Sequence, residues 1–443
     1  MKGGPWAASH RLGPRGSDAR QAGSTRASAG LQEPRLRPSA LAASVVAVHR
    51  ERVATVARIA SSTVRQSCAG SAARPFLVDV SLMNCGSAGR HCGTETVPGH
   101  GPHELSTGEV EAVLDDLSAI GAPRPRVVFS GGDPLRRPDL QTLVAHAAGA
   151  GLPVGVSVTS TPRATASSLA TLRLCGASAV SFSIGGASAA THDGICGVDG
   201  SFGSTIDACR AAVRVGLRLQ VSTTVRASTV FELPGIARLV DGVRAAMWNL
   251  FFEVPTKCTP TSEALSAAET EDVLAFLFDL APQVPLETTE APSFRRLLVH
   301  GVRGAPERTP GALYRRLRAR LADEWPLADR RAGSWPAPEG GHGRTPLAAG
   351  DGCGGVFVSH IGEVQPSRFL PLVVGNVRDT PLSELYANAP LLKALRDPAA
   401  HHGRCGRCEL NAICGGSRAQ AYARSGDPLA EDPTCDHRPA AEG

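Results

Sequence analysis

Three things are scarce in this chain of 443 residues. It has no apolar run long enough to span a membrane, so we expect no membrane partner. Lysine is nearly missing, with 3 Lys against 43 Arg, while Ala, Gly and Pro are abundant. We interpret that bias as the mark of GC-rich coding rather than of function.

A net basic charge is also missing outside the N-terminus. The formal net charge is +5, but residues 1–74 carry 12 Lys and Arg against 3 acidic residues, which leaves the rest of the chain near −4. The basic charge therefore belongs to a terminal extension, and we expect no nucleic-acid partner.

The N-terminal extension lacks the pattern of a folded domain. Residues 1–38 are rich in Gly, Pro, Ser and Arg without an apolar period, which predicts disorder. Residues 39–66 fit an amphipathic, arginine-rich helix. A transit peptide and a divergent N-terminus both fit this segment, and we favour the second.

From residue 75 the pattern changes to apolar strands alternating with amphipathic helices. A first helix is expected after Ser106, since Glu109 three residues later completes a capping box. Six strand–helix units in a row indicate an α/β fold, a partial (β/α)6 TIM-like barrel with a parallel sheet. The predicted strands are 76–82, 126–130, 154–158, 179–184, 217–225 and 247–254, and the later helices 138–150, 166–174, 204–215, 233–245 and 267–280.

The composition also divides the chain. Residues 75–300 carry the barrel pattern, 301–351 are rich in Arg, Pro and Gly and read as a connector, and 352–436 form a small, loop-rich, cysteine-bearing domain. We expect a functional site at the C-terminal ends of the barrel strands, where loops carry chemistry in such folds.

Four of the twelve cysteines crowd the C-terminus with the spacing CxxC-x5-C-x20-C. In a long chain without a clear secretory signal, this cluster favours metal or iron–sulfur ligation in a reducing compartment, and hence the cytoplasm. A structural zinc ion is the competing interpretation. The four candidate ligands are Cys405, Cys408, Cys414 and Cys435.

Two loops follow the first strands. Cys85 and Cys92 come directly after the first, with Gly89 between them. After the second comes Gly131-Gly132-Asp133-Pro134, in which glycines permit a close backbone approach and the carboxylate is an acceptor for an ammonium group. Taken alone, this second loop is also good turn chemistry.

Together these residues resemble the radical S-adenosylmethionine (SAM) enzymes with a C-terminal SPASM domain. The family loop reads CxxxCxxC, and Gly89 stands where its middle cysteine belongs. The resemblance implies a 4Fe–4S cluster on Cys85, Cys92 and a third ligand, for which His91 and Cys68 are candidates. It also implies S-adenosylmethionine bound at Gly131, Gly132, Asp133 and Pro134, with Ser183 further along.

The same resemblance implies one auxiliary 4Fe–4S cluster on the four C-terminal cysteines. The other auxiliary site of the family is degenerate, because Ser367 and Arg418 stand where ligand cysteines are expected, which leaves Cys353 over. Near the cofactor, Gly185 and Ser222 replace the family's usual Asp and Asn.

Several short sequence segments, such as 131–139, 288–296 and 369–378, resemble those of a subgroup that modifies tetrapyrroles in heme and heme d1 biosynthesis. The resemblance implies an oxidoreductase-type enzyme that uses a 5′-deoxyadenosyl radical on a tetrapyrrole or a peptide, with a reducing electron donor. Gly89 keeps a second interpretation open, a non-catalytic homologue that retains only the auxiliary cluster and acts as a binding protein.

Overall fold

The computed structural model describes residues 74–84, 103–158, 161–256, 261–303, 309–326 and 350–439. The predictions for the N-terminal extension, for Cys68, and for Cys85, Gly89, His91 and Cys92 lie outside these ranges. Within them, no helix is both long and apolar enough to cross a membrane.

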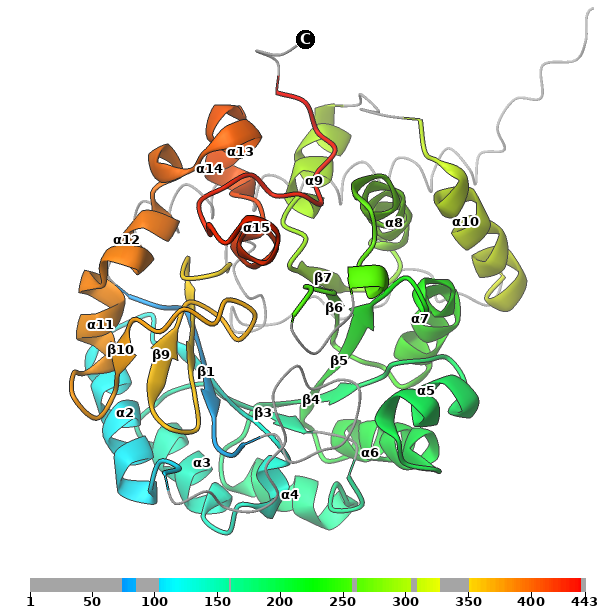
Figure 1. The fold of residues 1–443 in the computed structure, drawn as a ribbon. Coiled ribbons are helices and arrows are strands. Elements are labelled where there is room, and N and C mark those ends of the chain that lie inside the picture. Colours follow the sequence, from blue (N-terminus) through cyan, green and yellow to red (C-terminus); the bar gives the residue numbers. More distant parts are fainter. Residues whose placement is uncertain are drawn as a thin grey trace, which may run out of the picture. The chain divides into compact units, whose positions relative to one another are not determined.

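A parallel sheet forms the centre of the fold (Figure 1). The six predicted strands are confirmed to within two residues at each end, and a seventh, β7, follows them. β7 was not predicted because Leu-Glu-Thr-Thr is short and mostly polar. The strands are β1 Leu77–Ser81, β2 Arg126–Ser130, β3 Val154–Val158, β4 Ala179–Ser183, β5 Arg218–Val225, β6 Met247–Phe252 and β7 Leu286–Thr289.

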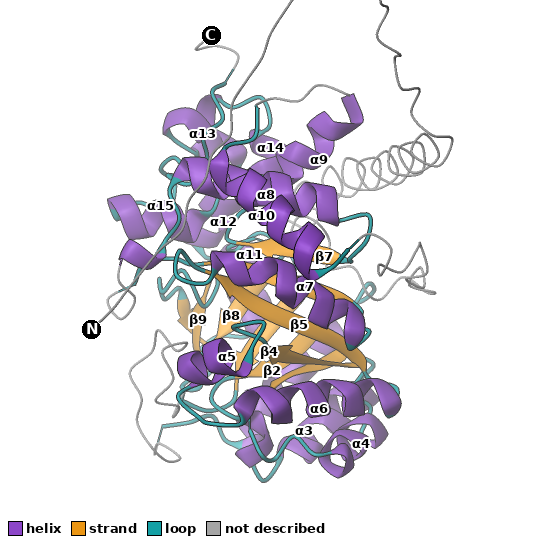
Figure 2. Ribbon diagram, turned by 90° about the vertical axis from the view of Figure 1, so that its right-hand side faces the viewer, coloured by secondary structure: helices purple, strands orange, loops and turns teal. Residues whose placement is uncertain are grey.

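Helices connect successive strands and cover the outer side of the sheet (Figure 2). The Ser106–Glu109 capping box is present at the start of α2, and α4 and α8 have the predicted bounds. The helices α5, α9 and α10 were not predicted. The helices of this part are α2 Thr107–Ala119, α3 Leu140–Gly149, α4 Ala166–Leu174, α5 Ala189–Cys196, α6 Ser201–Arg214, α7 Leu233–Gly242, α8 Ala267–Leu280, α9 Phe294–Arg303 and α10 Ala312–Glu324, with 3-10 turns η1 Pro134–Arg136, η2 Val230–Glu232 and η3 Thr261–Glu263.

The C-terminal part of the chain extends the same sheet. Strand β8 (Gly355–Val358) pairs in parallel with β1, and β9 (Glu363–Gln365) and β10 (Gly375–Asn376) continue antiparallel from it. The sheet therefore runs in the order β10-β9-β8-β1-β2-β3-β4-β5-β6-β7. The remaining helices are α11 Leu382–Asn388, α12 Pro390–Arg396, α13 Gly403–Arg407, α14 Asn411–Cys414 and α15 Arg418–Ser425, with the turn η5 Pro398–Ala400.

Alternation along each strand separates the core from a polar inner face. In β1, Val78 and Val80 are fully buried in the main core, whereas Asp79 between them points the other way. On that other side Arg368, from the turn after β9, bonds both Asp79 and Ser130 of β2. From the same turn Phe369 packs against Phe251 of β6, with ring centroids 5.6 Å apart. The C-terminal part thus reaches across the inner face of the barrel.

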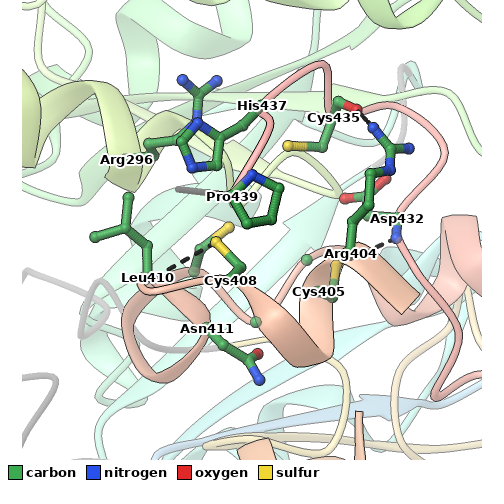
Figure 3. A pocket seen from close by; sticks show the side chains of 13 residues that line it. Arg296, Arg404, Cys405, Cys408, Leu410, Asn411, Asp432, Cys435, His437 and Pro439 are labelled. Atoms are coloured by element: carbon green, nitrogen blue, oxygen red, sulfur yellow. Dashed lines mark hydrogen bonds between the residues drawn. The ribbon is translucent and has the colours of Figure 1, made fainter. Parts of the chain in front are cut away.

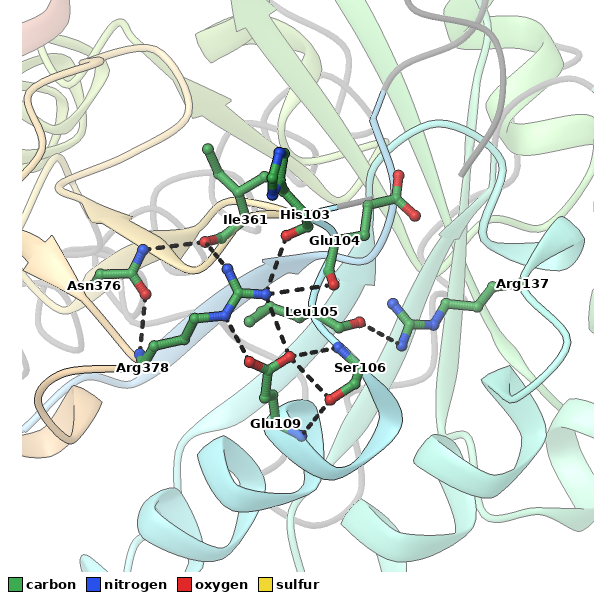
Figure 4. A network of polar contacts seen from close by, with 9 residues as sticks. All are labelled: His103, Glu104, Leu105, Ser106, Glu109, Arg137, Ile361, Asn376 and Arg378. Atoms are coloured by element: carbon green, nitrogen blue, oxygen red, sulfur yellow. Dashed lines mark hydrogen bonds and ion pairs between the residues drawn. The ribbon is translucent and has the colours of Figure 1, made fainter. Parts of the chain in front are cut away.

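An arginine ties the C-terminal strands to the start of α2 (Figure 4). The Arg378 guanidinium pairs with Glu109 (Nε to Oε1, 2.6 Å) and donates to the carbonyls of Ile361 and His103. This network joins segments more than 250 residues apart in sequence.

Candidate functional site

The four C-terminal cysteines line one pocket (Figure 3). Cys405 lies in α13 and Cys414 ends α14, while Cys408 sits between these two short helices. Cys435 comes from the loop after α15, so it reaches the pocket only through the fold. The wall is completed mainly by Arg296, Leu410, Asn411, Asp432 and His437.

Backbone and side-chain N–H groups point at two of the sulfurs. The amide of Leu410 donates to Cys408 Sγ at 3.4 Å, and the amide of Asp432 donates to Cys405 Sγ at 3.3 Å. Arg418 Nη2 adds a third contact, 3.5 Å from Cys405 Sγ. Such donors stabilise thiolates, and hydrogen bonds to ligand sulfurs tune the potential of iron–sulfur clusters.

Burial favours the protonated form of three of the four thiols. It raises the pKa of Cys414 and that of Cys435 to about 12, and it raises the pKa of Cys408 as well. Arg295 and Arg296 of α9 oppose the shifts at Cys414 and Cys408 through their positive charge. Metal binding here must therefore release protons, because the thiolate is the ligand.

The sulfurs are not gathered as they would be around a single ion. One zinc ion with four thiolates at about 2.3 Å brings every sulfur within about 4 Å of the others. Among the described residues, the group of three possible ligands that gathers within 4.8 Å is Cys408, Glu409 and His437, not three cysteines. A 4Fe–4S cluster places each thiolate on a different iron and so accepts a wider spacing.

A glycine makes the approach of one sulfur possible. Gly416 has φ +66°, and a Cβ there would lie 2.9 Å from Cys405 Sγ and 2.9 Å from Asp432 Cβ. The turn after Cys414 can thus close on the pocket because residue 416 has no side chain.

At the other end of the site, Gly131 and Gly132 press against the strand that leads to the Cys85 loop. Both have positive φ, +83° and +49°. A Cβ on Gly131 would overlap Ser81 Oγ and come within 2.6 Å of the Met83 carbonyl oxygen, and one on Gly132 would lie 2.7 Å from the Asn84 carbonyl oxygen. This close contact places the Gly-Gly turn directly beside the start of the cysteine loop.

Asp133 and Pro134 continue this turn. Asp133 Oδ1 accepts from the Leu135 amide at 3.1 Å and so caps the 3-10 turn η1, which Pro134 begins. Burial raises the pKa of Asp133, and a hydrogen bond with Thr161 lowers it in part.

Arg137 holds the ends of the cysteine loop, a role that the sequence analysis did not assign. Its Nη1 donates to the Leu82 carbonyl at 2.8 Å and its Nη2 to the Leu105 carbonyl at 2.9 Å, while Asp139 pairs with Nε at 2.7 Å. Residues 82 and 105 flank the loop on either side. Arg137 lies in the 131–139 segment, but nothing in that segment shows that it bridges two backbones.

Ser183 is exposed at the end of β4 and lies opposite Ser222 of β5 in the register. The Thr-His-Asp motif after it is structural. His192 is fully buried and its Nδ1 accepts from the Gly185 amide at 3.2 Å, whereas Asp193 accepts from the Gly200 and Phe202 amides at the start of α6. These contacts shape the turn that follows Ser183.

Comparisons with known proteins agree with this arrangement. Residues 84–235 match the Radical SAM superfamily. The chain is 32% identical over 362 residues to the AdoMet-dependent heme synthase of Oleidesulfovibrio alaskensis, covering 80% of this chain and 85% of the relative. It is 28% identical to the pre-heme d1 synthase of Dinoroseobacter shibae, covering 82% and 86%.

Among solved structures, the fold is similar to Streptococcus suis SuiB bound to precursor peptide SuiA. The TM-score is 0.56 at 13% identity, over 82% of this chain and 76% of the other. The fold defines a partial-barrel α/β protein with a cysteine-rich C-terminal part.

The chain belongs to the radical SAM superfamily, within the SPASM-type subgroup related to heme and heme d1 synthesis. Membership of this superfamily implies a 4Fe–4S cluster and S-adenosylmethionine.

Proposed function

We propose that this protein is a radical SAM enzyme that acts on a tetrapyrrole of the heme pathway. The similarity to an AdoMet-dependent heme synthase, 32% over 80% of the chain, is the observation that carries the proposal. It favours an enzyme over the non-catalytic homologue, and a peptide is the second substrate class that the resemblance implies.

The Gly131–Gly132 turn and Asp133 would bind S-adenosylmethionine at the C-terminal edge of β2, with Ser183 on the neighbouring part of that edge. Two observations support this assignment. The turn lies against the backbone of Met83 and Asn84 at the start of the cysteine loop, and Asp133 follows it with a carboxyl group, the type of acceptor that an ammonium group needs. Bound together, the cluster and S-adenosylmethionine supply a 5′-deoxyadenosyl radical. Cys85, Cys92 and a third ligand, still to be identified, would hold that cluster.

An auxiliary 4Fe–4S cluster would occupy the pocket of Cys405, Cys408, Cys414 and Cys435. The supporting observations are the shared pocket, the N–H donors on two sulfurs and the absence, among the described residues, of three cysteines within 4.8 Å of one another. Arg295 and Arg296 would offset the negative charge of the ligated thiolates.

Tetrapyrrole intermediates carry carboxylates, and the inner face of the barrel suits polar groups. Asp79, Ser130 and Arg368 lie on that face, with 40% of the Arg368 side chain exposed. Arg368 crosses from the C-terminal part, so both parts would line the substrate site. The division into 75–300, 301–351 and 352–436 remains part of the proposal, as do a reducing electron donor and a reducing, cytoplasmic setting suited to buried thiols.

Iron and sulfide analysis after anaerobic reconstitution tests the proposal. About eight irons per chain are expected, two clusters of four, together with reductive cleavage of S-adenosylmethionine. Cys408→Ala should remove about half of the iron. Cys175→Ala, a half-buried cysteine outside both loops, is the matched control and should remove none.

Two other results would contradict the proposal. About four irons that survive Cys85→Ala, with no cleavage of S-adenosylmethionine, would indicate a binding protein with an auxiliary cluster alone. A colourless zinc-loaded protein would refute both clusters.

A further inference from the structure

A buried group of carboxylates lies between the barrel and the cysteine pocket. Glu290 directly follows β7, Asp351 precedes β8, and Asp432 is in the loop after α15. Their exposed fractions are only 8%, 6% and 1%. Three acidic side chains brought together without water need strong local compensation.

The start of α15 binds all three. Ser417 Oγ donates to Glu290 Oε2 at 2.5 Å, and the Ser417 amide donates to Asp432 Oδ2 at 2.7 Å. The Ala419 amide donates to Asp351 Oδ2 at 2.8 Å. The unpaired amides of a helix N-terminus are natural partners for such oxygens.

One oxygen of the group receives no donor from the protein. Asp351 Oδ1 is buried without a hydrogen-bond partner, although Glu290 and Asp351 lie within hydrogen-bond reach of each other. Two ionised carboxylates cannot donate to one another, whereas a protonated Glu290 can donate to Asp351. Burial and mutual repulsion both raise the pKa of Glu290, and burial raises the pKa of Asp351.

The backbone holds Glu290 in this place against its own preference. Its φ is +61°, a left-handed backbone conformation that residues other than glycine rarely adopt. The surrounding contacts therefore impose the position of this carboxyl group, which faces Ser417 rather than solvent.

Asp432, the third carboxylate of the group, lines the cysteine pocket and connects it to the other two. Asp432 joins the Ser417 amide to Cys405, because its own amide donates to Cys405 Sγ at 3.3 Å. Arg418, the nearby cation, contacts Cys405 Sγ and acts electrostatically on Asp351, to which Ser367 is hydrogen-bonded. The charged and titratable groups facing the pair are thus Asp432 and Arg418. Ser367 and Arg418 stand where the family carries ligands of its other auxiliary cluster, and both act on Asp351 here.

We propose that Glu290 and Asp351 share a proton and form a proton-binding site coupled to electron transfer at the cysteine pocket. The inference rests on the proposed auxiliary cluster. When that cluster gains one electron, the ionised pair takes up one proton from solvent, which the two carboxylates then share, and reoxidation releases the electron and the proton. The proton offsets the negative charge that the cluster gains on reduction. Arg418 has a fixed charge, so it cannot follow that change.

The test is a redox titration of the auxiliary cluster at several pH values, monitored by electron paramagnetic resonance. Cys85→Ala/Cys92→Ala is the background, so that one cluster is observed. The midpoint potential should fall with rising pH, by up to about 59 mV per pH unit, the limit for one proton per electron. The slope should lie above the usual titration range of a carboxyl group, because burial raises the pKa of Glu290 and of Asp351.

Glu290→Gln should abolish this slope, and so should Asp351→Asn. Glu431→Gln is the matched control. Glu431 accepts a hydrogen bond at 2.9 Å from the amide of Arg404, a residue that lines the cysteine pocket. Because the pKa of Glu431 is lowered, its carboxylate stays charged throughout the titration. That variant should keep the slope.

If both variants fail to fold, redox-difference infrared spectroscopy of the unsubstituted chain replaces them. The carbonyl band of a protonated carboxyl group should grow on reduction. A potential independent of pH, or a slope that survives Glu290→Gln, would overturn the inference while the proposed function stands. Failure to assemble the auxiliary cluster would overturn both.

Discussion

At the scale of single residues, two glycines determine the geometry of the turn after β2, where we propose that S-adenosylmethionine binds. Gly131 and Gly132 are required twice over, by their positive φ and by the Ser81, Met83 and Asn84 atoms that a Cβ would meet. Their place in the Gly-Gly-Asp-Pro motif predicted a close backbone approach. The structure shows that the approach is to the cysteine-loop strand, which sequence spacing alone does not reveal.

Gly131→Ala is therefore expected to disturb the start of the cysteine loop. Strain of about 1–3 kcal/mol is expected from the backbone conformation, and the affinity for S-adenosylmethionine should fall by more than tenfold. Urea unfolding and equilibrium dialysis measure the two effects. Gly108→Ala, on α2 with open space around it, is the control and should leave both unchanged; equal behaviour of the two variants would refute the role of Gly131.

At the scale of elements, the segment after β2 binds both ends of the cysteine loop, which lies elsewhere in the sequence. Arg137 is buried, and its guanidinium satisfies the carbonyls of Leu82 and Leu105, with Asp139 compensating its charge. Both flanks of the cysteine loop are thus held by one side chain.

Removing that side chain by Arg137→Ala should destabilise the fold by about 2–4 kcal/mol, because it leaves two backbone carbonyls and the Asp139 carboxylate without their partner. The iron bound by the Cys85 loop should also fall. Urea unfolding and iron analysis check the two expectations. Arg136→Ala, the exposed neighbour, serves as the control, and a loss of equal size there would show that the position of the guanidinium is irrelevant.

At the scale of the whole molecule, the C-terminal part of the chain packs against the first strand and the first helix of the barrel. Strand β8 pairs with β1, Arg368 reaches Asp79, and Arg378 clamps the start of α2. Helix α9 of the barrel part closes one side of the cysteine pocket through Arg296.

The Glu109–Arg378 clamp predicts a pH dependence. Hydrogen bonds from Arg378 and the Ser106 amide lower the pKa of Glu109 from 4.5 to about 2. A lowered native pKa means that the stabilisation is present above the unfolded value and is lost as the pH falls from about 4.5 toward 2.

The melting temperature of the unsubstituted chain should thus exceed that of Glu109→Gln at neutral pH, and the gap should close on acidification. The pair is solvent-exposed, so the gap is expected to be small and to shrink in high salt. Glu111→Gln on the same helix is the comparison. A gap that is constant down to pH 3 would contradict the assignment.

The sequence by itself determined the strands, most helices, the family and the candidate ligands. Hydrophobic period, capping boxes and motif spacing are local properties, and local preference is read directly from neighbouring residues. It missed β7 and α5, because a four-residue polar strand and a helix inside a motif carry little periodic signal.

Only the tertiary structure decided which distant residues meet. Glu290 and Asp351 are 61 positions apart, and Ser417 lies a further 66 beyond. Nothing in their neighbourhoods marks them, since a single acid at a strand end or in a turn is common. Their shared burial at the start of α15, and hence their capacity to hold a proton beside the cysteine pocket, comes from β8 entering the barrel sheet next to β1 and carrying the C-terminal part over the strand ends.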